Sequence, residues 1–385
     1  MSISTMSWGA GLVCLWNSCQ AASPGLPAVP AAPFPAPPAD PETAIIQQNL
    51  SRHVQTLAGE IGERNLAAPA GLNRAADYAR GQMAASGLPT RDQDYRVKPG
   101  LLRRKWAATG YERQTYRNIV GEIRGASRPE EIVVVGAHYD SVAIKGCHGA
   151  NDNASGVAAT LELARCFAGR PQARTLRFVA FANEEPPFFW SAGMGSYVYA
   201  KECRAKNEKI VAMLTPETIG YYSDRPGSQR YPLPFFSWFY PRRGNFVAWV
   251  ANDSGSKALH RRCLKVFQEH STFPAAGAVV PKWIPHAASS DHWAFAKVGY
   301  PALMITDTAM YRYHRYHTVH DDPDQLDYAK MAQVVAGLRA VVADLANPAV
   351  IPSRKQALQP AVKLERHSHE TENPADPAGS LPLAG

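Results

Sequence analysis

Two apolar stretches of this sequence each end in side chains that bind metal ions. The first, 133–140, ends in His138-Tyr139-Asp140, and the second, 176–182, is followed by Asn183-Glu184-Glu185. Apolar stretches of this length predict strands that are buried within a sheet. Imidazole and carboxylate groups are ligands that zinc takes in proteins. The sequence therefore predicts a buried sheet with metal-binding groups at the ends of two of its strands.

Strand and helix patterns alternate along most of the chain. We expect strands at 117–122, 132–137, 175–182, 210–214 and 302–305, and helices at 42–58, 72–85, 154–168, 256–268 and 328–345. This alternation is typical of the α/β class, in which a mostly parallel mixed sheet carries helices on both faces. Ligands of such folds gather beyond the carboxyl ends of the strands. The candidate residues all follow predicted strands or lie in the loops beside them.

The sequence contains three more candidate ligands: Asp152 lies in the loop between the two stretches, and Glu217 and His317 follow them. Two zinc ions roughly 3.5 to 4 Å apart need a shared anionic ligand, because the ions repel each other. Asp152 is the candidate for this bridge, since it lies in a polar turn that leads into a helix. An Asp in such a turn is ordinarily a helix cap. Because His138 and Glu185 accompany it in order, we predict a two-metal hydrolase site instead.

Three acidic residues are candidates for supporting, metal-binding or catalytic roles. Asp140, two residues after His138, is placed to accept the other imidazole N–H and so fix the tautomer. Neighbouring Glu184 and Glu185 point in opposite directions if the chain is extended. One of them can then bind a metal while the other faces the water between the ions and takes its proton. The alternative is that both are exposed loop residues.

The downstream loops contain more polar residues than a site needs. Ser290-Asp291-His292 is interpreted as a supporting loop segment beside the strand at 302–305. His314, His317 and His320 are spaced three apart, but Pro323 and the polar composition argue against one helix that displays all of them. Only His317 is therefore retained as a ligand.

Composition limits the other classes of function. With 385 residues, of which 45% are hydrophobic and 19% charged, the chain can bury a full core, and we expect one catalytic domain at 42–349. The net charge of +8 is spread along the chain without a run of five basic residues. The sequence therefore does not favour binding to nucleic acid.

Both ends of the chain differ from the centre. Residues 1–23 contain a short apolar stretch that is too short to span a membrane and resembles an export signal, although no Lys or Arg precedes it. A misassigned start codon would explain that lack, and a lipid anchor at Cys19 is an alternative. Residues 24–41 contain eight prolines and predict an extended linker, and 350–385 predict a disordered tail. We expect export to the periplasm or medium without a stable membrane span.

The cysteines leave the compartment open. Without the leader, the sequence retains Cys147, Cys166, Cys203 and Cys263, which permit three pairings into two disulfides and require none. Cys147 lies near the candidate ligands. Oxygen and imidazole ligands dominate there, so a structural thiol or half of a disulfide is favoured over a metal ligand.

Five segments together resemble peptidase family M28, the co-catalytic zinc aminopeptidases, whose relatives include glutaminyl cyclases. In order, they are Gly136–Ser141, Gly149–Val157, Phe181–Glu185, Ser290–His292, and Tyr316–Thr318 followed by Asp321. The resemblance covers about 43–346. It implies a phosphorylase/hydrolase-like zinc exopeptidase fold with two zinc ions per chain. The ligands that it implies are His138, Asp152, Glu185, Glu217 and His317.

The resemblance also implies roles within the site. Asp152 would bridge the ions, and Glu184 would be the general base that generates a hydroxide between them. Glu217 stands where relatives usually have Asp, which leaves the geometry of that site open. Tyr316 is similar to a tyrosine that steadies the oxyanion in some relatives, and packing is the alternative role.

Two aromatic segments bear on specificity. Pro186-Pro187-Phe188-Phe189-Trp190 follows Glu185, and its aromatic rings either line the substrate pocket or belong to the core or to a lid. Tyr221, Tyr222, Phe235, Phe236 and Trp238 predict an insertion at the mouth of the cleft.

The implied function is a zinc-dependent exopeptidase, an aminopeptidase that acts on the N-termini of peptides or proteins. One alternative is a glutaminyl cyclase with one zinc ion, and another is a non-catalytic binding ectodomain of the same fold. The sequence leaves open the preferred N-terminal residue, amino- against carboxypeptidase specificity, disulfide pairing, oligomeric state and replacement of zinc by another divalent ion.

Overall fold

The computed structural model describes residues 41–102, 104–281 and 283–348. The predicted export signal, the lipid anchor at Cys19, nearly all of the proline-rich linker and the C-terminal tail lie outside the described residues.

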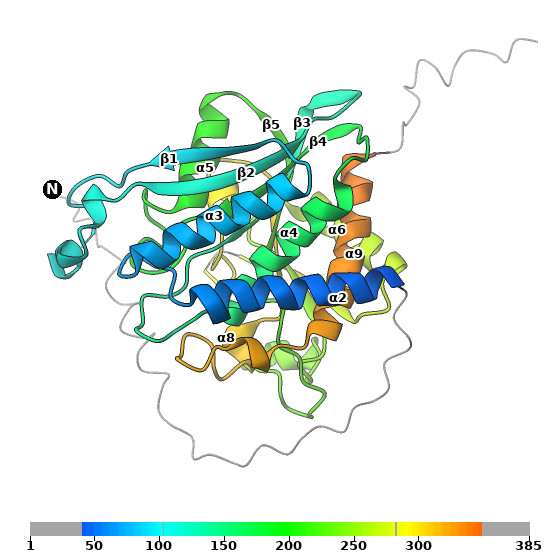
Figure 1. Ribbon diagram of the computed structural model, residues 1–385. Helices are drawn as coiled ribbons and strands as arrows, with labels where there is room; N and C mark the ends of the chain where they lie inside the picture. The colour runs from blue at the N-terminus through cyan, green and yellow to red at the C-terminus, as the bar shows by residue number, and fades with distance from the viewer. Residues whose placement is uncertain (1–40, 103, 282, 349–385) are drawn as a thin grey trace, which may run out of the picture.

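One eight-stranded sheet runs through the described part of the chain (Figure 1). Its strands are β1 (Thr90–Tyr95), β2 (Tyr116–Ile123), β3 (Arg128–His138), β4 (Arg174–Phe181), β5 (Lys209–Glu217), β6 (Val247–Ala251), β7 (Ala275–Val279) and β8 (Ala302–Thr306). Their order is β1-β2-β4-β3-β5-β8-β6-β7. The pairs β3–β4, β3–β5, β5–β8 and β6–β7 are parallel, and β1–β2, β2–β4 and β6–β8 are antiparallel. The predicted α/β class with a mostly parallel mixed sheet is confirmed.

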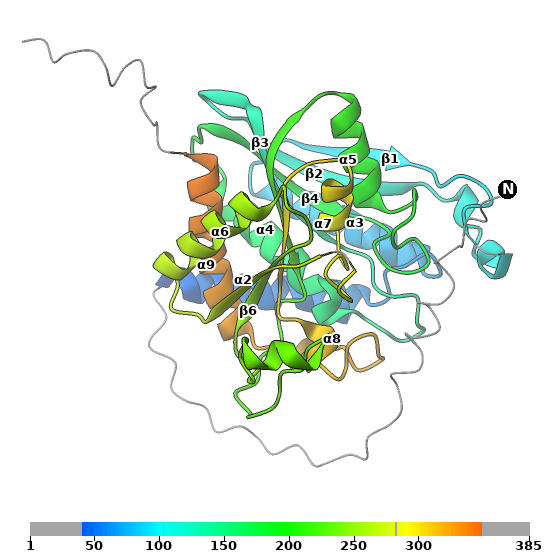
Figure 2. The ribbon, with the colours of Figure 1, turned by 180° about the vertical axis from the view of Figure 1, so that it is seen from behind.

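Helices cover both faces of this sheet. They are α2 (Pro41–Val54), α3 (Pro69–Ala85), α4 (Ser155–Phe167), α5 (Gly195–Ala205), α6 (Lys257–His270), α7 (His292–Lys297), α8 (Ala309–Arg312) and α9 (Tyr328–Ala346). Short helical turns lie at Gln55–Ile61, Arg104–Thr109, Tyr111–Arg113, Ala150–Ala154 (η4), Pro234–Trp238 (η5) and Pro323–Gln325. Figure 1 shows α2, α3, α4 and α9 in front of the sheet, and Figure 2 shows α5 and α7 on the other face.

Helix α4 positions the functional loop that precedes it. Every residue of α4 except Arg165 is buried, because the helix packs on β3, β4 and β5 and is itself covered by α2 and α3. Its sequence is mostly apolar, with Ser155, Thr160, Glu162 and Arg165 as the exceptions, which is typical of a helix in the centre of a protein. The turn η4 at its N-terminus is therefore held at the carboxyl ends of the central strands.

The structure has several elements that the sequence patterns did not predict, namely β1, β6, β7 and α5. Strand β1 is polar because it is an edge strand, and β7 is the other edge and contains mostly Ala and Gly. Neither shows the apolar alternation by which a half-buried strand is predicted. The prediction that Ser290-Asp291-His292 lies in a loop is wrong at its end, because His292 begins α7.

The four cysteines of the described residues are all free, buried thiols. The alternative of a disulfide at Cys147 is therefore wrong, and this residue is a structural thiol. Within the described ranges, no helix combines the length and the apolar character that crossing a membrane requires.

Candidate metal centre

The carboxyl ends of three central strands bring the candidate ligands to one edge of the sheet. His138 is the last residue of β3, Glu217 is the last residue of β5, and Glu184-Glu185 follows β4. Asp152 enters from η4 and His317 from the loop after α8. Parallel strands end at the same edge of a sheet, so residues far apart in the sequence meet there.

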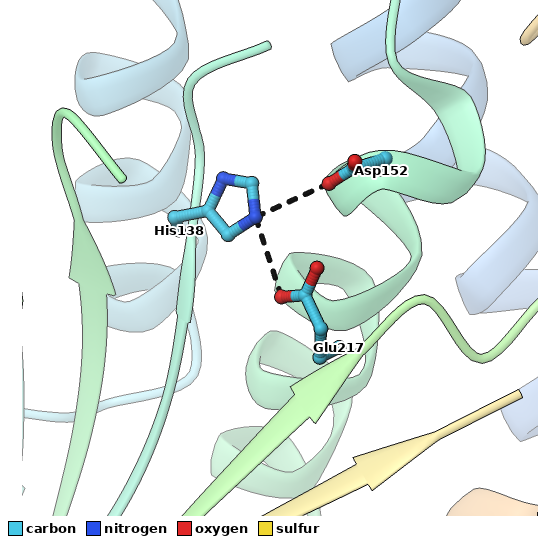
Figure 3. Close-up of side chains that lie close together, drawn as sticks. All are labelled: His138, Asp152 and Glu217. Atoms are coloured by element: carbon cyan, nitrogen blue, oxygen red, sulfur yellow. Dashed lines mark ion pairs between the residues drawn. The ribbon is translucent and has the colours of Figure 1, made fainter. Parts of the chain in front are cut away.

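The first group comprises His138, Asp152 and Glu217, which point toward one another (Figure 3). The Nε2 atom of His138 lies 3.3 Å from Oδ1 of Asp152 and 3.3 Å from Oε2 of Glu217. Zinc bonds of about 2.0–2.1 Å in a tetrahedron place neighbouring ligand atoms about 3.3 Å apart. All three side chains are buried. The spacing of this group therefore suits one zinc ion.

The second group comprises Asp152, Glu185 and His317. The Nε2 atom of His317 lies 2.9 Å from Oδ2 of Asp152 and 3.2 Å from Oε1 of Glu185. Asp152 thus presents one carboxylate oxygen to each group. The structure brings together all five predicted ligands, and it places the predicted bridge between the two groups.

Buried polar atoms in these groups test whether a metal fits. His138 Nε2, Asp152 Oδ1 and Glu185 Oε1 are buried and have no hydrogen-bond partner among the described residues. Each such atom costs about 1–3 kcal/mol when it is left unsatisfied. Three ligand carboxylates and Glu184 bring four negative charges, which two divalent cations would neutralise. The residues therefore fit two metal ions.

The pKa values of the same groups show how strongly the charges interact. Burial alone lowers the pKa of His138, but the carboxylates of Glu217 and Glu184 outweigh burial and raise it well above its usual value. At His317 burial is likewise outweighed, chiefly by Glu185, and the pKa rises to about 10. Burial raises the pKa of Glu185 to about 7, although His317 opposes the shift. A bound cation would supply the positive charge that keeps these carboxylates ionised.

Asp140 holds the loop that carries the two glutamates. Its Oδ1 accepts a hydrogen bond from the backbone N–H of Glu184, and its Oδ2 accepts one from that of Glu185, both at 3.0 Å. The imidazole Nδ1 of His138 lies 3.1 Å from the backbone carbonyl oxygen of Asp140 and 3.5 Å from Oδ1. The backbone carbonyl of Asp140, and not its carboxylate, is thus the nearer partner of the His138 imidazole. The carboxylate instead binds the backbone N–H groups of residues 184 and 185, which the sequence did not predict.

Glu184 and Tyr316 lie beside the ligands and belong to neither group. Oε2 of Glu184 lies 3.8 Å from Nε2 of His138, and Oε1 has no hydrogen-bond partner among the described residues. The half-buried ring of Tyr316 stacks on the imidazole of His317, with centroids 4.0 Å apart and planes at 13°. The ring of Tyr316 thus packs against a candidate ligand. His314 and His320 are exposed and lie in neither group.

Several polar residues of the motifs hold the candidate ligands in place. Ser290 Oγ and Asn153 Nδ2 each donate a hydrogen bond to Oε2 of Glu217, at 2.8 and 2.9 Å. Asp321 accepts hydrogen bonds from the backbone N–H groups of Asn151 and Asp152, at 2.8 and 3.1 Å. In the sequence these residues are recognisable only as polar residues within otherwise buried segments. The sequence did not predict which hydrogen-bond partner each of them would have.

The aromatic segments divide between the core and the surface. Phe188 is buried against Tyr111 and Tyr116, which favours the core interpretation for this ring. Phe189 stacks on Trp190 at 4.8 Å, and the indole N–H of Trp190 donates to the carbonyl of Ala288, which ties this loop to the one before Ser290. In the second segment Tyr221 packs against Tyr313, with the two rings tilted by 36°, and Tyr222 is buried against Phe273. Phe236 lines a cavity, and Phe235 and Trp238 are exposed.

Arg64 supports the site from a region where the sequence showed no functional signal. Its side chain is fully buried, and burial lowers the pKa of the guanidinium to about 10. It donates hydrogen bonds to the carbonyls of Leu57, Gly62, Tyr139, His148 and Gly149. Arg64 therefore joins the segment after β3 to the loop that leads to Asp152.

Replacing Arg64 with methionine should lower the free energy of unfolding by about 3–5 kcal/mol, because several buried carbonyls lose their donor at once. Urea denaturation in the presence of excess zinc would measure the change. Arg74→Met is the matched control, since Arg74 is exposed and, among the described residues, donates a hydrogen bond to the carbonyl of Ile61 alone. Equal destabilisation by the two substitutions would contradict the role of Arg64.

Sequence comparison finds relatives along most of the chain. The model of peptidase family M28 matches residues 118–342. The uncharacterized protein YfbL of Escherichia coli (strain K12) is 36% identical over 309 residues, which cover 78% of this chain and 88% of YfbL. A protein of Leptosphaeria maculans named as a probable zinc metalloprotease is 28% identical over 205 residues. That match covers 49% of this chain and 46% of the metalloprotease, so the chain spans about half of that relative.

Structural comparison finds the same architecture in solved proteins. BSAP, a zinc aminopeptidase from Bacillus subtilis, aligns with a TM-score of 0.61 at 16% identity, over 78% of this chain and 95% of BSAP. A glutaminyl cyclase of Bacteroides thetaiotaomicron aligns with a TM-score of 0.56 at 16% identity, over 77% of this chain and 97% of the cyclase. At these identities the alignments show the fold, and one fold can carry several functions.

Proposed function

The chain belongs to peptidase family M28, and from this premise we propose that it is a zinc-dependent aminopeptidase that hydrolyses N-terminal peptide bonds. The observation that carries the proposal is the pair of buried ligand groups that share Asp152, with the carboxylate of Glu184 beside them. A site that served only for binding would need neither a shared ligand nor an additional carboxylate.

In this proposal the two groups would hold two zinc ions, one between His138, Asp152 and Glu217 and one between Asp152, Glu185 and His317. When bound, zinc polarises a carbonyl group and lowers the pKa of water to about 7. Glu184 takes the proton of the attacking water and passes it to the leaving amine. Asp140 keeps Glu184 in position through the backbone hydrogen bond.

The support for this division of roles is geometric. Oε1 of Glu185 lies 3.2 Å from Nε2 of His317, whereas Oε2 of Glu184 lies 3.8 Å from Nε2 of His138. Glu184 therefore lies within reach of the site while its oxygens remain outside the ligand groups. A general base must lie within hydrogen-bond reach of the proton that it removes, directly or through a water molecule.

We expect aminoacyl chromogenic amides to be cleaved in a zinc-dependent reaction. A panel with different N-terminal residues, each with a free or acetylated amine, would be assayed before chelation, after chelation and after zinc is restored. Cleavage that requires the free amine supports an aminopeptidase, and cleavage of peptides from the carboxyl end would instead assign a carboxypeptidase. No cleavage of any substrate with zinc added would contradict the proposal and favour a binding protein.

Metal analysis by plasma emission separates hydrolysis from cyclisation. About two zinc ions per chain are expected for the hydrolase, whereas about one zinc ion with cyclisation of N-terminal glutamine would assign a glutaminyl cyclase.

Chelation should also lower the thermal unfolding midpoint Tm by about 5–15 °C, because ligands that bind only the folded state stabilise it. Scanning calorimetry with and without chelator measures this shift. An unchanged Tm together with full metal loss would show that the two groups do not hold the ions.

A further inference from the structure

Exposed hydrophobic side chains gather on one part of the surface. Of the ten large hydrophobic side chains that are exposed in the described residues, five lie on two segments near the β7 edge of the sheet. We call these five the aromatic patch: Phe235, Trp238, Phe239, Val279 and Trp283. Trp238, Phe239 and Trp283 are 75%, 76% and 73% exposed. Rings of this size are rarely so exposed unless they take part in an interaction.

The two segments form one surface although about forty residues separate them. The hydroxyl of Tyr240 donates a hydrogen bond to the carbonyl of Gly277 in β7, at 3.3 Å. Phe236 and Tyr240 of the first segment and Val280 and Ile284 of the second line the same cavity of about 100 Å³. Figure 2 shows the turn η5, in green, at the periphery below β6.

The segments that carry the aromatic patch contain arginines and no carboxylate. Residues 225–252 contain four arginines and neither Asp nor Glu, and residues 271–290 also contain no carboxylate. The arginines are Arg225, Arg230, Arg242 and Arg243, and all four are exposed. Exposed Trp and Phe beside arginines are the composition of surfaces that bind the interface of an anionic membrane.

Other occupants fit this surface less well. A second copy of the chain would bring like-charged arginines together across a two-fold axis, and this repulsion disfavours a symmetric dimer. A single strand of nucleic acid needs a basic groove along which its backbone can run. The three most exposed rings instead project from the surface, which suits insertion among lipid headgroups.

We propose that the aromatic patch and its four arginines form a docking surface for an anionic lipid membrane. Trp238, Phe239 and Trp283 insert at the level of the headgroups, and the arginines contact the anionic lipids. This inference goes beyond the proposed peptidase activity and does not depend on it, because it concerns a surface outside the candidate metal centre.

Co-sedimentation of the full chain with vesicles tests the docking surface. We expect binding to vesicles of phosphatidylcholine with about one-third phosphatidylglycerol, and at least tenfold weaker binding to phosphatidylcholine alone. The double substitution Trp238→Ser/Phe239→Ser should weaken partitioning into anionic vesicles at least tenfold. Arg242→Gln/Arg243→Gln should weaken it about tenfold or more.

The matched control removes two arginines at the opposite edge of the sheet. Arg91 and Arg96 are exposed in and just after β1, so Arg91→Gln/Arg96→Gln changes the net charge equally and should leave binding unchanged. Unaltered zinc content and Tm show that each variant is folded.

Three outcomes would overturn the proposal. One is that the wild-type chain does not sediment with anionic vesicles. Another is that the two patch variants bind as the wild type does, or no more weakly than the Arg91→Gln/Arg96→Gln control. The third is that the patch variants lose self-association or polynucleotide binding shown by the wild-type chain while their binding to vesicles is unchanged, which would reassign the surface.

Discussion

Replacing Glu184 with glutamine should lower kcat by about 10²–10⁴-fold while zinc content stays at about two ions per chain. The amide has nearly the same shape as the carboxylate but cannot accept a proton. Glu184 belongs to neither ligand group, so its substitution removes no metal ligand. The hydrogen bond to Asp140 comes from the backbone N–H of residue 184 and is therefore retained. The substitution thus separates proton transfer from metal binding.

The measurement is steady-state kinetics on the best amide of the panel, with zinc determined on the same preparation. Glu60→Gln is the control, since Glu60 is an exposed acid outside the site. A large fall in kcat with little change in KM indicates that the lost interaction acts in the transition state. Near wild-type turnover in the Glu184 variant would show that another group is the base. Loss of zinc would instead show that Glu184 is a ligand.

Three candidate ligands, His138, Glu185 and Glu217, could be predicted because each lies at or just after the end of an apolar strand, whereas Asp152 and His317 lie in η4 and in the loop after α8. His138 and Glu217 end β3 and β5, and strands that are buried on both faces have a strong sequence signal. Parallel pairing then brings their ends together whatever the length of the loops between them. Short stretches of sequence were therefore enough to predict the mostly parallel sheet and the convergence of the ligands that end its strands.

The supporting contacts could not be predicted because their partners are distant in the sequence. Arg64 reaches carbonyls more than seventy residues away, and the carboxylate of Asp140 accepts hydrogen bonds from residues 184 and 185. An arginine in a polar segment has the same sequence signal whether it is exposed or buried. Only the packed structure shows that Arg64 replaces water as the donor to several carbonyls.

Hydrogen bonds fix the conformation of the Glu217 side chain in the first ligand group. A longer side chain has more rotamers than the usual aspartate, so the sequence left the geometry of this ligand open. Ser290 and Asn153 both donate to Oε2, and this oxygen lies 3.3 Å from Nε2 of His138. Two hydrogen bonds thus restrict the longer side chain to a conformation that suits the first group.

Replacing Asp152 with asparagine should reduce bound zinc from about two ions per chain to one or fewer and should abolish measurable peptidase activity. Asp152 gives one oxygen to each ligand group. The amide offers only one oxygen, and its NH₂ group would point at one of the two imidazoles or ions. Loss of the negative charge also removes the anionic bridge that offsets repulsion between two cations. Both effects weaken the same site, so the loss of zinc should exceed the loss caused by removing any one hydrogen bond around the ligands.

Asp321→Asn is the graded control for this prediction. Asp321 contacts the backbone N–H of residue 152 and no candidate ligand atom, so its substitution should weaken zinc affinity only about 10–100-fold. Zinc titration monitored by a competing chelator, with plasma emission on the dialysed protein, measures both variants. Retention of two tightly bound ions by the Asp152 variant would show that the bridge lies elsewhere. Asp152 has one oxygen near each of the two imidazoles, whereas Asp321 holds only the backbone of the turn. An equal loss of zinc in both variants would therefore show that the conformation of the turn, and not the shared carboxylate, determines zinc binding.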